Sequence, residues 1–209
     1  MESHTEQTEH RKLELNCLVV GESNIGKTGL IRALHSQPGQ DFVLESLPTI
    51  GIECSSSTHQ IKNIELVLHL WELQMKDIDF LWKIDDINFE FVFLCFAAER
   101  SPRLKKLQEF KKKFEKTKYG SAQFIIVGCC SDLLSSLSPT EFVDYLKNAQ
   151  KYANQMKSSI VFTSSKAKVF INDYRKMIFD AFLSKKLFIF DINSMVKNFE
   201  RNTQVELDA

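Results

Sequence analysis

A glycine-rich segment near the N-terminus has the residue types and the spacing of a phosphate-binding loop. Residues 21–28, GESNIGKT, satisfy the pattern G-x-x-x-x-G-K-[ST]. In such a loop, backbone N–H groups surround a phosphate at a helix N-terminus, the lysine adds a positive charge, and the Ser or Thr hydroxyl binds Mg²⁺. The alternative is a glycine turn with a surface lysine, which the strand-like run before the segment and the helical pattern after it disfavour. The residues predicted to surround the phosphates are Gly21, Glu22, Ser23, Asn24, Ile25, Gly26, Lys27, Thr28 and Gly29.

Two further positions could complete a nucleotide site. Thr49 lies in the loop LPTIGIE, and its hydroxyl could join that of Thr28 as a ligand of Mg²⁺. Asp132 follows an apolar run in GCCSD, so its carboxylate lies at the end of a predicted strand, where a ligand is expected. The alternatives are an ordinary turn threonine for Thr49 and a helix or turn cap for Asp132.

The elements that must position these residues alternate between strands and helices. Apolar runs rich in Val, Ile and Phe predict strands near residues 15–20, 64–71, 89–96, 124–130 and 159–164. Helical patterns cover residues 26–36, 139–156 and 170–184 and a segment that opens at Ser101, and Ser138 with Glu141 forms a capping box. Residues 50–72 predict an antiparallel edge hairpin. The fold class is therefore α/β, a doubly wound and mostly parallel sheet with helices on both faces and its ligand at the carboxyl ends of the strands.

Composition excludes several classes of protein. The 209 residues suit one domain, and 27 Lys and Arg balance 27 Asp and Glu, so no overall charge favours nucleic acid. Five cysteines without Cys-x-x-Cys spacing favour reduced thiols in a cytoplasmic protein. We expect no membrane span and no lipid anchor, because the sequence has neither a long apolar run nor a terminal Cys-a-a-X box. We also expect a monomer.

The order of these segments resembles the Ras-superfamily small GTPases, a family of P-loop nucleotide-binding proteins. Over residues 13–184, GESNIGKTGLI, TIGIE, LWEL and the stretch from residue 148 to residue 183 are most similar to the fungal septation and mitotic-exit GTPases. The resemblance implies a six-stranded sheet, GTP or GDP with Mg²⁺, and signalling to a protein kinase cascade at the spindle pole under a GTPase-activating complex. It also implies a flexible N-terminus over residues 1–12, a G domain over 13–184 and a C-terminal extension over 185–209.

The resemblance assigns roles to the base-binding residues and exposes one departure. Asp132 matches the aspartate of the family's Thr-Lys-x-Asp or Asn-Lys-x-Asp motif, whose carboxylate accepts hydrogen bonds from both N1–H and N2–H of guanine. TSSK supplies Ser164, Ser165 and Lys166 for the last base loop. Cys129 and Cys130 replace the polar residue and the lysine of that motif. The cover that the lysine gives the base is therefore missing, and we expect weaker nucleotide affinity.

The greatest departure lies in WELQMKD, which aligns with the family's Trp-Asp-x-Gly-Gly-Gln. Glu72 stands for the aspartate that orders Mg²⁺ through water, Met75 for the glycine whose N–H meets the γ-phosphate, and Lys76 for the catalytic glutamine. Lys76 can only donate hydrogen bonds, whereas glutamine also accepts one from the attacking water. Gln74 is the remaining candidate for that task if the register of this loop is shifted.

These residues predict a nucleotide-binding switch with very slow GTP hydrolysis. The alternative is a pseudo-GTPase that serves as a protein-binding scaffold with little or no dependence on nucleotide. An ATP-using P-loop kinase is disfavoured, since that class does not account for Asp132 or TSSK.

Overall fold

The computed structural model describes residues 11–36, 51–61, 63–83, 87–98, 104–167 and 171–184. The predicted N-terminal segment before residue 11, Thr49 and the predicted C-terminal extension 185–209 lie outside these residues. No helix in the described part is long and apolar enough to cross a membrane.

A six-stranded sheet forms the centre of the fold, in the order β2-β3-β1-β4-β5-β6. All neighbours pair in parallel except β2 and β3, which form the antiparallel edge hairpin that the sequence predicts. The strands are β1 (Arg11–Gly21), β2 (Ile52–Ile61), β3 (Ile64–Gln74), β4 (Phe91–Ala97), β5 (Gln123–Cys129) and β6 (Ser159–Phe162). The predicted α/β fold class is confirmed.

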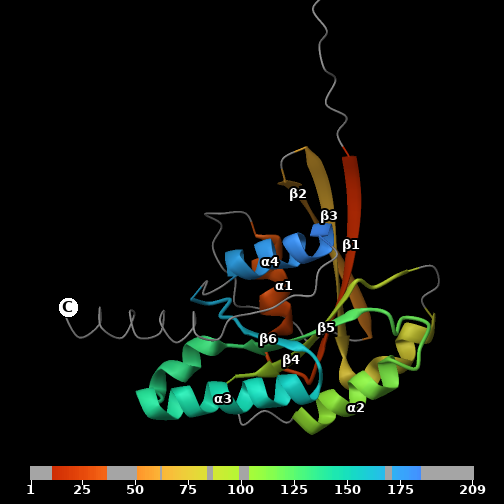
Figure 1. Ribbon diagram of the computed structural model, residues 1–209. Coiled ribbons are helices and arrows are strands. Elements are labelled where there is room, and N and C mark those ends of the chain that lie inside the picture. The colour runs from red at the N-terminus through yellow and green to blue at the C-terminus, as the bar shows by residue number, and fades with distance from the viewer. Residues whose placement is uncertain are drawn as a thin grey trace, which may run out of the picture.

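Helices cover both faces of the sheet because its central strands are apolar on both sides. Helices α1 (Lys27–His35) and α4 (Ile171–Ser184) pack on one face, and α2 (Leu104–Phe114) and α3 (Pro139–Gln155) on the other (Figure 1). Strand β4 is buried along its whole length, as is typical of a strand with helices on both sides. Two separate hydrophobic clusters result, one for each face of the sheet.

The predicted capping box at the start of α3 is confirmed. The Ser138 side chain accepts a hydrogen bond from the backbone N–H of Glu141, and the Glu141 carboxylate accepts one from the backbone N–H of Ser138. Along this helix Phe142, Leu146 and Ala149 are buried, whereas Tyr152 is 45% exposed.

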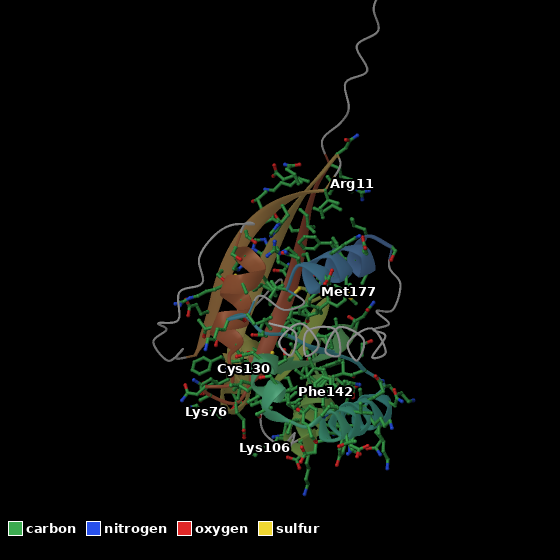
Figure 2. The ribbon with its side chains drawn as sticks, turned by 90° about the vertical axis from the view of Figure 1, so that its left-hand side faces the viewer. Arg11, Lys76, Lys106, Cys130, Phe142 and Met177 are labelled. Atoms are coloured by element: carbon green, nitrogen blue, oxygen red, sulfur yellow. The ribbon has the colours of Figure 1, made fainter. Side chains whose placement is uncertain are left out.

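Two short 3-10 helices were not predicted from the sequence. The first, η1 (Met75–Lys83), follows β3 directly, and the second, η2 (Ser131–Ser136), follows β5. Both begin at the carboxyl ends of strands, where the functional residues were expected. Figure 2 shows Lys76, Lys106 and Cys130 gathered at this end of the sheet, while Arg11 lies at the opposite end.

Candidate functional site

The glycine-rich segment forms a tight turn between β1 and α1. A Cβ atom at Gly21 would lie 2.6 Å from the backbone oxygen of Cys95, so only glycine permits this approach of β1 to β4. Asn24 and Gly26 adopt left-handed backbone conformations with φ of 59° and 95°. Helix α1 then begins at Lys27, which places backbone N–H groups and the positive end of the helix dipole at the turn. This is the strand, loop and helix order that phosphate binding needs.

Lys27, Thr28 and Glu72 form a compact polar cluster beside this turn. The Lys27 side chain is 4% exposed, and its Nζ donates to the backbone oxygen of Glu22 over 2.8 Å. The same Nζ lies 3.7 Å from Oε1 of Glu72, whose side chain is 7% exposed. Thr28 Oγ1 lies 2.8 and 3.0 Å from the two carboxylate oxygens of Glu72. The structure therefore brings together three of the residues that the sequence assigned to phosphate and metal binding.

These oxygen atoms suit a hard divalent cation. Mg²⁺ prefers carboxylate, hydroxyl and phosphate oxygens, and Thr28 and Glu72 supply the first two kinds. In the described residues no group of three or more His, Cys, Asp or Glu side chains could hold a metal. A cation here would therefore draw its remaining ligands from water and from the phosphates of a nucleotide.

Gln74 is hydrogen-bonded to the phosphate loop. It is the last residue of β3, pairs in register with Gly21, and is 8% exposed. Its Oε1 accepts a hydrogen bond from Ser23 Oγ over 2.8 Å. The sequence left open whether Gln74 could orient a water molecule, and the structure places its accepting oxygen against Ser23.

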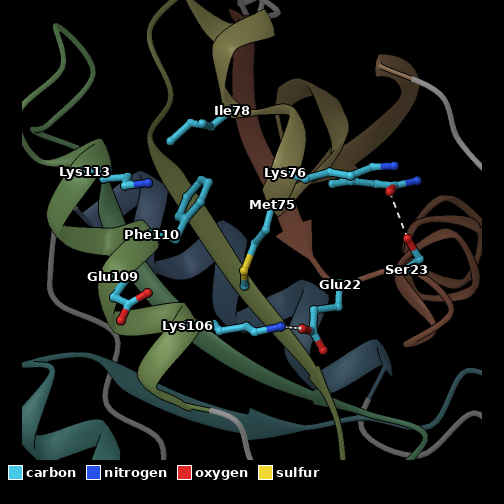
Figure 3. Close-up of a pocket in the computed structure, with 10 residues that line it drawn as sticks. Glu22, Ser23, Met75, Lys76, Ile78, Lys106, Glu109, Phe110 and Lys113 are labelled. Atoms are coloured by element: carbon cyan, nitrogen blue, oxygen red, sulfur yellow. Dashed lines mark hydrogen bonds and ion pairs between the residues drawn. The ribbon is translucent and has the colours of Figure 1, made fainter.

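Lys76 and Met75 lie on a cavity of about 510 Å³ next to the phosphate loop (Figure 3). The cavity lies between η1 and α2, and Lys106 of α2 forms an ion pair with Glu22 across it. Lys76 is exposed, whereas Met75 is partly buried against the apolar cluster under α2 and α3. The residue at the expected catalytic position is thus a solvated cation.

The residues predicted to bind the base also converge. Ser164 is fully buried, and its Oγ donates to Oδ1 of Asp132 over 2.6 Å, which joins the turn after β5 to the turn after β6. The backbone N–H of Ala167 donates to the same Ser164 oxygen, while Ser165 is partly exposed and Lys166 exposed. Asp132 lies in the first turn of η2. This place is compatible with both roles predicted for the residue, a helix or turn cap and a base-binding carboxylate.

Cys130 occupies the place of the missing lysine and packs on the phosphate loop. Its Sγ lies 4.0 Å from the backbone oxygen of Ile25, and a Cβ atom at Gly26 would be 3.0 Å from that sulfur. Its neighbour Cys129 is the last residue of β5. Cys130 lies beyond the end of β5 in a left-handed conformation, with φ of 59°, so the chain turns and both residues contact the same apolar cluster.

The cysteines near the site are structural thiols. A hydrogen bond with Cys95, followed by burial, raises the pKa of the Cys129 thiol well above its ordinary value. The five described cysteines are free, and a buried thiol that stays protonated is a poor nucleophile and a poor metal ligand. Cys129 and Cys130 therefore contribute to packing at this site.

Two contacts at the site were missed from the sequence: the ion pair of Glu22 with Lys106 and the hydrogen bond of Ser23 with Gln74. The contact of Ser23 with Gln74 had a usable signal, because β1 and β3 were both predicted as strands of one sheet. Ser23 follows the end of β1, and Gln74 is the last residue of β3. The first had none, because nothing in the helical pattern of α2 singles out Lys106 among its lysines.

Comparison with known proteins agrees with this geometry. A sequence model of the Ras family matches residues 16–184. The chain is 26% identical over 165 residues to Septum-promoting GTP-binding protein 1 of Schizosaccharomyces pombe, covering 77% of this chain and 79% of the relative. It is 24% identical over 193 residues to Ras-related protein Rab-11B of Dictyostelium discoideum, covering 87% of this chain and 81% of the relative. The phosphate loop, the strand order and the family match together show that the chain belongs to the Ras family, as a small GTPase of the Ras superfamily.

Proposed function

We propose that this Ras-family protein is a guanine-nucleotide switch that hydrolyses GTP very slowly. The observation that carries the proposal is the arrangement around β3, in which Gln74 is bound to Ser23 and the next polar side chain, Lys76, is an exposed cation. Small GTPases use a glutamine to orient the attacking water. Neither residue is placed to do so here.

The chemical argument concerns hydrogen-bond acceptors. The attacking water needs an acceptor for one of its protons, and a lysine ammonium has none. Gln74 has an acceptor, but its oxygen already meets Ser23 in a position that is 8% exposed. Freeing it requires breaking this hydrogen bond and turning a side chain that is 8% exposed away from the loop.

Guanine selection is supported by the Asp132 carboxylate. Ser164 holds Oδ1 of Asp132 and so fixes the direction of the carboxylate beside the phosphate loop. Cys130 is shorter than the family's lysine and lies against Ile25, so it covers less of a bound base. We therefore expect the protein to select guanine nucleotides and to bind them with modest affinity.

A role in septation or mitotic exit is part of the same proposal. It is supported by the similarity to a septum-promoting GTP-binding protein and by the sequence resemblance over residues 148–183. A protein kinase as effector, a GTPase-activating complex as regulator and a cytoplasmic location near the spindle pole follow from that resemblance. The test is expression in S. pombe cells depleted of their septum-promoting protein, with Thr28→Asn as the matched inactive variant. Rescue by the wild type but not by Thr28→Asn supports the role, and no rescue by either contradicts it.

The nucleotide proposal is tested on purified protein. Chromatography of the released small molecules should find GDP or GTP with the wild type and much less with Thr28→Asn, because Thr28 loses its hydroxyl. Lys76→Gln should then raise single-turnover GTP hydrolysis at least about tenfold, by restoring an acceptor for the water. Lys113→Gln, at an exposed lysine on the same cavity, is the control and should leave the rate unchanged.

The scaffold alternative makes the opposite predictions. A pseudo-GTPase would retain no guanine nucleotide, and Thr28→Asn would leave its partner binding unaltered. An unchanged rate in Lys76→Gln, in protein that does retain nucleotide, would instead show that Lys76 is not at the catalytic position.

A further inference from the structure

Thr28 and Glu72 are in direct contact through the threonine hydroxyl and the carboxylate. Three oxygens, Thr28 Oγ1 and both carboxylate oxygens of Glu72, lie within 3.0 Å of one another across the contact. Only one hydrogen, that of the threonine hydroxyl, is available between them. In place of that hydrogen bond, a divalent cation could take the hydroxyl oxygen and a carboxylate oxygen together as ligands.

Burial fixes this arrangement. Glu72 lies in β3 opposite Val19 of β1, and its side chain is 7% exposed. Thr28 is held in the first turn of α1, directly after the phosphate loop. The Lys27 ammonium, 3.7 Å from Glu72 Oε1, balances the carboxylate charge on one side. Glu72 therefore presents a charged, preoriented carboxylate beside the hydroxyl expected to bind metal.

The spacing of the oxygens matches one coordination shell. Mg²⁺ binds oxygens at 2.0–2.1 Å in octahedral geometry, which puts adjacent ligands roughly 2.9–3.0 Å apart. Thr28 Oγ1 and the Glu72 oxygens are separated by 2.8 and 3.0 Å. An aspartate at this position would end roughly 1.5 Å short of that contact, the length of one C–C bond.

We propose that Glu72 binds the divalent cation directly, beside Thr28, and does not act through an intervening water. The proposal rests on the nucleotide-binding function proposed above, since the protein supplies too few ligands in the described residues to hold a cation without phosphates. It makes Glu72 a residue that sets metal preference: a second protein oxygen replaces one water in the shell.

A consequence concerns the choice of metal. Ca²⁺ accepts carboxylates in flexible geometry, whereas Mg²⁺ demands a near-ideal octahedron and releases its waters reluctantly. A direct carboxylate, able to offer two oxygens, shifts the preference toward Ca²⁺ relative to a site that keeps the water. Glu72→Asp should restore the preference for Mg²⁺ in slowing nucleotide release.

The test counts the waters on Mn²⁺ in the protein–GDP complex, from the broadening of its electron paramagnetic resonance lines in ¹⁷O-enriched water. With ligands from Thr28, Glu72 and one phosphate oxygen, roughly three of the six octahedral positions are left for water. Glu72→Asp should gain one more. The control is Glu53→Asp, the same shortening at the exposed residue that pairs with Glu72 across the hairpin, and it should match the wild type.

The outcomes separate the two proposals. A wild-type complex with roughly four waters, or equal counts in wild type and Glu72→Asp, overturns direct binding by Glu72 and leaves the nucleotide proposal standing. Should Glu72→Asp fail to fold, the wild-type count decides alone. A protein that retains no GDP in the presence of Mn²⁺ contradicts the nucleotide proposal, and this inference fails with it.

Discussion

Replacing Arg175 should destabilise the contact between α4 and the end of α1. The Arg175 side chain is 9% exposed, and its Nη2 donates to the backbone oxygens of Ala33 and Ser36 over 2.8 and 2.9 Å. These carbonyls lie at the C-terminus of α1, where backbone oxygens lack helical partners and a positive charge is favourable. Arg175 thus fixes the C-terminal end of α1.

The expected loss follows from these contacts. A hydrogen bond from a charged donor contributes about 1.5–3 kcal/mol. Two costs offset these bonds. Burial of the guanidinium lowers the pKa of Arg175, and its Nε has no hydrogen-bond partner within the described residues. For Arg175→Met, which keeps most of the apolar stem, we expect a net loss of about 2 kcal/mol in the free energy of unfolding.

Urea denaturation followed by circular dichroism measures this loss. With a urea dependence of about 2–3 kcal/mol/M, the midpoint should fall by roughly 0.7–1 M. Lys176→Met, at the exposed neighbour on α4, is the control and should change the midpoint little. A loss below about 0.5 kcal/mol for Arg175→Met, equal to that of the control, would refute the role given to this side chain.

Three further outcomes are expected. Burial lowers the pKa of His35 to about 4, so its neutral form is favoured in the folded state and stability falls as pH drops from about 6.5 toward 4. Discounted for partial exposure, the expected loss of unfolding free energy is about 1–2 kcal/mol, measured by urea denaturation at each pH. His35→Gln should flatten this pH dependence. Cys130→Lys should slow GDP release about tenfold, measured with a fluorescent GDP analogue, because a lysine stem and charge would cover the base; an unchanged rate would show that Cys130 is not beside it. Ser138→Ala should cost about 1 kcal/mol by removing the capping box, and a thermal midpoint equal to that of the wild type would contradict this.

The elements of the fold could be predicted from the sequence because local patterns determine them. Apolar strands such as residues 91–97, the glycine spacing around Lys27 and the capping box at Ser138 each depend on neighbours in the chain. The 3-10 helix after β3 could not be predicted, because residues 75–83 have no capping signal and their backbone is set by packing against the sheet and α2.

The roles of the site residues were predictable only in part. The identities of Glu72 and Lys76 indicated a changed catalytic site, since they depart from a known motif. The direct contact of Glu72 with Thr28 and the hydrogen bond of Gln74 with Ser23 depend on which side chains of the phosphate loop and α1 face the end of β3. Such contacts are set by tertiary packing and leave no periodic trace in the sequence.

The most direct test of the proposed function is a single-turnover measurement of GTP hydrolysis by the purified wild-type protein loaded with GTP and Mg²⁺. Ordinary Ras hydrolyses GTP without assistance at about 3–5 × 10⁻⁴ s⁻¹. With Lys76 at the glutamine position and Gln74 bound to Ser23, we expect stable GTP binding and a rate at least about tenfold lower. A rate equal to or above that of Ras, with no contribution from other proteins, would contradict the proposal.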